Sequence, residues 1–246
     1  MRTANPALNA KTFESVRSTP YDGVMTIQGT VNKTGIMLLL LIASASWTWK
    51  SYYSLGAKAV IPWMTLGIFA GFIIALATIF YKKAAPFTAP VYALAEGLVL
   101  GGLSAVLEGR FPGIVIQAVG LTFGTLLFLL MAYKSGAIQA TENFKLGVVA
   151  ATGGIAVVYF ITMILRFFGV NVPYIHSSGI VGIGFSLFVV IVAALNLVLD
   201  FDFIESAAEA GAPKYMEWYA AFGLMVTLIW LYIEILRLLT KMRERR

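Results

Sequence analysis

The 246-residue sequence contains no cysteine, which excludes disulfides, thiolate metal sites and thiol catalysis. Charged residues are also scarce. They make up 12% of the chain and hydrophobic residues 59%, whereas soluble proteins have about 25% and about 45–50%. One water-soluble core cannot bury that much apolar surface, so we expect an integral membrane protein. The net charge of +6 comes from lysines and arginines in short loops and tails, which favours membrane orientation over nucleic-acid binding.

Enzyme motifs are missing as well. A serine nucleophile needs a base, but the only histidine, His176, falls in a predicted loop, and Ser104 has no assignable base. An intramembrane aspartyl protease needs two carboxylates from separate helices, and the last segment lacks a Gly-x-Gly-Asp motif. There is no Gly-x-x-x-x-Gly-Lys phosphate loop and no His-Glu-x-x-His zinc motif. We therefore expect neither enzymatic activity nor a cofactor.

Seven apolar segments follow one another along the chain, separated by short loops. Each is close to the ~20 residues that cross a ~30 Å hydrocarbon core as a helix. Their approximate limits are 34–53, 60–81, 87–107, 113–133, 146–166, 178–201 and 216–240. Strands of a membrane barrel would be about ten residues long with alternating polarity, and this pattern is absent. The expected fold class is all-α, a polytopic membrane protein with seven transmembrane helices.

The two ends of the chain differ from this seven-helix domain of residues 34–240. Residues 1–33 are polar and lack the apolar core of about 7–15 residues that a secretory signal has. We expect them to form a cytoplasmic N-terminal arm, and residues 241–246 to form a basic C-terminal tail.

Glycines four residues apart occur in three segments. The pairs are Gly67 with Gly71, Gly97 with Gly101, and Gly120 with Gly124. Such spacing lets membrane helices approach closely. We expect the pairs to pack inside the monomer, with a dimer face as the alternative, and hence a monomer or weak homo-oligomer.

The candidate functional residues are acids in or beside the apolar segments, where carboxylates are rare and usually functional. They are Asp200, Asp202, Glu234, Glu96 and Glu217. Asp200 follows about 20 apolar residues and is the deepest acid of its cluster, whereas Asp202 and Glu205 share another helix face. Structural roles stay open for the rest. Asp202 and Glu205 can meet water at a helix end, and Glu96 can make a packing hydrogen bond.

Glu234 lies three residues before Arg237, a spacing that allows an ion pair along one helix. Four aromatic residues of the last segment are expected to anchor it at the membrane interfaces. They are Trp218, Tyr219, Trp230 and Tyr232. His176 is expected to be an ordinary loop residue.

Three stretches resemble the Bax inhibitor family of membrane proteins, in its bacterial YccA-like branch. They are residues 90–104 (PVYALAEGLVLGGLS), 197–205 (LVLDFDFIE) and 217–237, which begins EWYAAFG and ends LYIEILR. The resemblance covers about residues 34–240. It implies six helices wrapped around a central seventh, and an inner-membrane location if the protein is bacterial.

The resemblance also implies a function, because family members are described as pH-sensitive calcium leaks. In them an aspartate at the cytoplasmic end of helix six pairs with one near the start of helix seven. Asp200 matches the first, but Thr227 stands at the second position. Any carboxyl pair in this chain therefore joins Asp200 or Asp202 to a glutamate, the nearest being Glu217 and Glu234.

Two functions of different classes remain. The first is a pH-sensitive cation leak, with calcium or protons as the ions and carboxylates at the contact of helices six and seven as the gate. The second is a non-transporting partner that modulates a membrane quality-control protease, for which the N-terminal arm is suited.

The distribution of lysine and arginine yields a testable topology. With the N-terminus inside, the inner side holds nine basic residues and the outer loops hold four, which favours this orientation. Seven crossings then place the C-terminal tail outside, although it adds five basic residues there. Reporter fusions at Met1, Lys83, Ser135 and Arg246 should place only Arg246 outside. A cytoplasmic signal at Arg246 would contradict seven full crossings.

Overall fold

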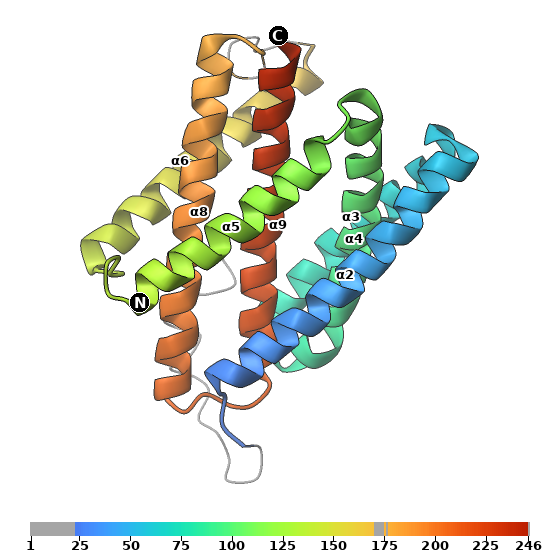
Figure 1. Cartoon of the computed structure of the whole chain (residues 1–246). Coiled ribbons are helices and arrows are strands. Elements are labelled where there is room, and N and C mark those ends of the chain that lie inside the picture. Colours follow the sequence, from blue (N-terminus) through green and yellow to red (C-terminus); the bar gives the residue numbers. More distant parts are fainter. Residues whose placement is uncertain (1–22, 170–174, 176, 246) are drawn as a thin grey trace. The chain divides into compact units, whose positions relative to one another are not determined.

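The computed structural model describes residues 23–169, 175 and 177–245. Its long elements are α2 (Ile27–Leu55), α3 (Ala57–Phe80), α4 (Ala85–Arg110), α5 (Ile114–Lys134), α6 (Glu142–Phe167), α8 (Ile180–Glu209) and α9 (Met216–Glu244), with a short 3-10 turn, η1 (Lys82–Ala84) (Figure 1). Within the described ranges these seven α-helices are long and apolar enough to cross a membrane. The all-α, seven-span prediction is confirmed.

Local sequence signals explain where the helices begin and end. The Thr26 hydroxyl caps α2 by accepting a hydrogen bond from the Gly29 N–H at 2.9 Å, so the helix starts before the apolar segment that begins at residue 34. Gly56, with φ +85°, joins α2 directly to α3, and Gly113, with φ +81°, precedes α5. Glycine suits both joints because it adopts positive φ without steric cost.

The chain divides into two compact units, and both α8 and α9 contribute to each. The α2–α4 unit contains α2, α3, α4 and residues 203–226, and the α5–α6 unit contains α5, α6, α8 up to residue 202 and α9 from residue 227. α9 has the largest buried share of the seven spans, 61% of its most apolar window. The resemblance implies such burial for the last helix.

Glycines bring the helices of the α2–α4 unit into backbone contact. A β carbon at Gly97 would overlap the Leu41 carbonyl and the Ser44 hydroxyl of α2, and one at Gly101 would overlap Ala45. On α3, a β carbon at Gly67 would lie 2.6 Å from the Ala95 carbonyl oxygen of α4. The expected close packing inside the monomer is therefore present for the first two glycine pairs.

The third pair behaves differently. No described atom outside the local helix lies within 4 Å of the β-carbon positions of Gly120 and Gly124. Both line an open, mainly apolar groove of about 430 Å³ between α5 and α8. The expectation of packing inside the monomer is wrong here, because the side chains of α8 stand back from this face of α5.

This contrast provides a matched pair of substitutions. Gly97→Leu should lower the free energy of unfolding by about 1–3 kcal/mol, because the new side chain would push α2 and α4 apart. Gly120→Leu introduces the same residue into the open groove and should change stability little. Thermal unfolding of both variants in detergent is the measurement. Equal losses would contradict the packing difference.

Candidate functional site

The acids at the end of α8 occupy three environments. Asp200 is completely buried, as its position after a long apolar run predicts. The Asp202 side chain is 19% exposed, and Glu205 is exposed. Asp202 does not simply meet water at a helix end, because it has a basic partner.

That partner is Lys145, which lies in the first turn of α6. Its Nζ is 2.8 Å from Asp202 Oδ2 and 3.5 Å from Glu142 Oε1, and the Lys145 residue is only 6% exposed. Thr141 caps the helix at this point, where its hydroxyl accepts from the Phe144 N–H. In the sequence, Lys145 lies in the loop directly before the apolar segment 146–166, and its spacing from Glu142 was the one available signal of an ion pair.

A further polar contact joins α6 to α8. Asn196 of α8 is buried and donates from Nδ2 to the Thr152 hydroxyl at 2.9 Å. Asn196 precedes Asp200 by four residues, so the two share a face of α8.

Tyr159 of α6 joins an ion pair of α9. Arg237 Nη1 lies 2.6 Å from Glu234 Oε1 and donates to the Tyr159 hydroxyl at 2.7 Å, and this hydroxyl donates to Glu234 Oε1 at 3.1 Å. The Arg237 guanidinium also lies 5.3 Å from the centre of the Tyr159 ring. The predicted Glu234–Arg237 ion pair is confirmed. Glu234 is, however, 1% exposed and thus buried.

The polar residues of α6 recur every seven positions: Lys145, Thr152, Tyr159 and Arg166. Because seven residues make almost two turns, they form one slowly rotating stripe. Lys145 and Arg166 are 21 residues apart, or about 32 Å at 1.5 Å per residue, which is close to a ~30 Å hydrocarbon core. We call this stripe and its partners on α8 and α9 the α6 seam. None of the acids by itself indicates the α6 seam, although the seven-residue spacing is present in the sequence.

A buried lysine holds the far end of α9. Lys241 is 6% exposed, and its Nζ donates to the carbonyl oxygens of Ile175 and Gly182 and to the Ser186 hydroxyl, at 2.7, 3.0 and 2.8 Å. The sequence placed Lys241 in a basic tail. It instead belongs to the helix and ties α9 to the start of α8.

In the α2–α4 unit, Glu217 is the centre of a charged cluster. This fully buried carboxylate accepts from the Thr26 N–H and hydroxyl, both at 3.0 Å, and forms ion pairs with Lys33 and with Lys214, the latter at 2.8 Å. A β carbon at Gly29 would overlap the carboxylate. The start of α9 is thereby joined to the capped start of α2.

Glu96 lies elsewhere in the same unit and is half-buried. It hydrogen-bonds to Tyr92 one turn earlier, and a β carbon at Gly71 would lie 2.8 Å from its Oε1. A packing hydrogen bond is thus the role that its contacts support.

One of the predicted interface anchors, Tyr219, is buried instead, and another, Trp230, is partly buried. Tyr219 is 1% exposed and packs against Phe222, with Lys82 Nζ 5.9 Å from its ring centre. Trp230 packs against the apolar core of α6 and α8 around Ile155. The interface prediction is wrong for Tyr219, because α9 is enclosed along most of its length.

The candidate acids are divided between the two units. Asp200, Asp202 and Glu234 belong to the α5–α6 unit, and Glu96 and Glu217 to the α2–α4 unit. Any carboxyl pair was expected to join Asp200 or Asp202 to a glutamate. In the described contacts Asp202, Glu217 and Glu234 each bond to basic side chains instead. Among the described residues, no group of three or more acidic, histidine or cysteine side chains is placed to hold a metal ion. His176 lies outside the described residues.

Together these features define a polytopic α-helical membrane protein whose last helices carry buried, partnered charges. The chain belongs to the Bax inhibitor 1 like family, whose sequence profile matches residues 5–244. A comparison with curated proteins finds no match.

The Glu217 cluster generates a graded prediction. Glu217→Gln should cost about 3–5 kcal/mol of stability, because it removes the charge that compensates the lysines in a buried pair. Lys214→Gln should cost at most about 1 kcal/mol, since Lys214 is 51% exposed and Lys33 remains. Chemical or thermal unfolding in detergent provides the comparison. A cost for Lys214→Gln that equals the cost for Glu217→Gln would show that the carboxylate is not the centre.

Proposed function

We propose that this membrane protein is a pH-sensitive cation leak, and that the α6 seam is part of its ion path. The observation that carries the proposal is the length of the seam: polar contacts recur along α6 from Lys145 to Tyr159, about 21 Å at 1.5 Å per residue, or roughly two thirds of a ~30 Å hydrocarbon core. Polar groups at that depth are costly, and in membrane proteins they usually mark ion or proton pathways.

The seam supplies the oxygen atoms that hard cations require. Asp202 and Glu142 lie at one end, Thr152 and Asn196 in the middle, and Glu234 beyond them. Calcium takes six to eight oxygen ligands, carboxylate, amide and water oxygens among them. A leak needs only weak, successive sites of this kind, and calcium is the ion that we favour.

Fixed cations close the path in the state described here. Lys145 forms an ion pair with Asp202, and Arg237 forms one with Glu234. An entering cation must therefore displace a basic side chain from each carboxylate. Protonation of Asp202 weakens its bond to Lys145 and changes the contact between α6 and α8. Asp200 is fully buried two residues away on the same helix. The carboxylates of α8 are therefore the proposed pH sensor.

The alternative is a non-transporting partner that modulates a membrane quality-control protease. It requires an accessible surface rather than a polar seam, and none of the described contacts favours it. The two functions separate in one experiment, since only the first produces ion flux from the purified chain alone.

Ion flux in liposomes that contain only this protein, measured at several pH values, tests the leak. Asp200→Asn should flatten the pH dependence between about pH 6 and 8, because it keeps the shape of the side chain and removes its titration. The matched control is Glu205→Gln on the exposed side of α8, which should leave the pH response intact.

A full pH response in the Asp200→Asn protein would exclude Asp200 as the sensor. Absence of flux through the wild-type protein would refute the leak and favour the partner function.

A further inference from the structure

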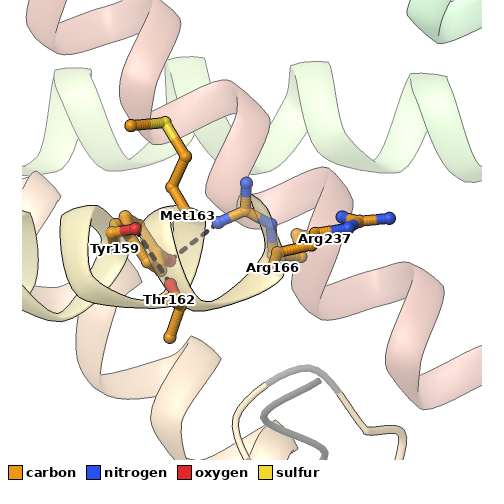
Figure 2. A pocket seen from close by; sticks show the side chains of 5 residues that line it. All are labelled: Tyr159, Thr162, Met163, Arg166 and Arg237. Atoms are coloured by element: carbon orange, nitrogen blue, oxygen red, sulfur yellow. Dashed lines mark hydrogen bonds between the residues drawn. The ribbon is translucent and has the colours of Figure 1, made fainter. Parts of the chain in front are cut away.

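A second charged feature lies where the α6 seam ends. Tyr159, Thr162, Met163 and Arg166 of α6 and Arg237 of α9 line an open pocket of about 420 Å³ (Figure 2). The pocket therefore combines two arginines from different helices with apolar and hydroxyl-bearing side chains. Tyr159, Arg166 and Arg237 also belong to the α6 seam, but the pocket contains none of the carboxylates that the proposed ion path uses.

The electrostatics of the pocket favour an anion. Glu234 compensates one of the two guanidinium groups and does not itself line the pocket, so one positive charge remains. Arginine has five N–H donors. Arg237 commits Nη1 to Glu234 and Tyr159, and its side chain is 38% exposed. These contacts hold the Arg237 guanidinium in a fixed orientation, while Arg166 is exposed in the last turn of α6.

Guanidinium groups match a phosphate ester. Each presents a planar fork that can bond two phosphate oxygens at once, which a single ammonium group cannot do. The Thr162 hydroxyl is directed to the Tyr159 carbonyl at 2.9 Å, so the donors for an anion come from the arginines.

The surroundings indicate a lipid as the source of that phosphate. Met163 lines the pocket and is 61% exposed, and Phe167 and Phe168, next to Arg166, are 93% and 78% exposed. Exposed aromatic and apolar side chains beside arginines are typical of the membrane interface, where headgroups meet acyl chains. The crossing order of the helices places this end of α6 on the membrane face opposite Lys145.

We propose that this pocket binds the phosphate group of a phospholipid, with Arg166 and Arg237 as the ligating residues and the exposed side chains of α6 against the acyl chains. Binding there bridges α6 to α9 at the end of the seam.

Native mass spectrometry of the full chain in mild detergent tests the site with defined lipids. The wild-type protein should retain phosphatidylglycerol and should not retain diacylglycerol, which has the acyl chains and no phosphate. Arg166→Gln should weaken phosphatidylglycerol binding about tenfold, the effect of losing one charged hydrogen-bonding group. Arg166→Lys keeps the positive charge and loses the planar fork of N–H donors. Its affinity for phosphatidylglycerol should lie between those of the wild-type protein and Arg166→Gln.

The matched control is Arg110→Gln. Arg110 is an exposed arginine in the last turn of α4, as Arg166 is in the last turn of α6, and it does not line the pocket. Phosphatidylglycerol binding should be unchanged in this variant. Equal weakening by Arg110→Gln, or equal retention of diacylglycerol, would overturn the proposal.

Inorganic phosphate separates the two possible sources of the anion. At millimolar concentration it should not displace phosphatidylglycerol, because it lacks the acyl contacts. Displacement by inorganic phosphate at the affinity of the lipid would overturn the lipid assignment. Thermal unfolding of each variant without added lipid ensures that a loss of binding does not reflect a loss of folding.

Discussion

The cost of holding a charged group within a hydrocarbon layer is the constraint on which this structure depends. An ionised side chain there needs a compensating charge and several hydrogen bonds to remain buried. Glu217 has two lysines and a capping threonine, and Glu234 has an arginine and a tyrosine. Both carboxylates belong to α9, so the ionic contacts of α9 decide which helices it can pack against.

Close packing makes part of this compensation possible. Lys33 reaches Glu217 because α2 begins early, capped by Thr26, and because Gly29 presents no side chain toward the carboxylate. Gly97 and Gly101 bring α2 and α4 into backbone contact in the same unit. Backbone geometry and electrostatics therefore support each other in the α2–α4 unit: a larger side chain at Gly29 would displace the acid from its partners.

Composition and segment length were sufficient to predict seven helices. The apolar composition indicates a membrane protein, and the length of each apolar segment matches the thickness of the bilayer. Burial of Asp200 and the Glu234–Arg237 pair were also predictable, because each depends on neighbours along one helix. Contacts between helices were not. Such contacts depend on which faces of two helices meet, and the hydropathy of the sequence does not specify this. Examples are the Lys145–Asp202 ion pair, the Tyr159–Glu234 hydrogen bond and the burial of Tyr219. The seven-residue spacing along α6 carried this information, but it has meaning only once the partners on α8 and α9 are known.

The partners of these acids bear on how the proposed leak could be gated. Two carboxylates that share a proton are held together at low pH and repel when both ionise. In the α6 seam, Asp202 and Glu234 instead pair with fixed cations, and protonation of an acid in such a pair breaks the contact. The sign of the response is thus reversed: a shared-proton pair tightens on acidification, whereas a salt-bridged pair loosens. The presence of Thr227 at the second aspartate position is consistent with this difference, since the buried hydroxyl of Thr227 cannot form the repelling pair. On the proposed function, acid pH would loosen α6 from α8 in this chain by releasing Lys145.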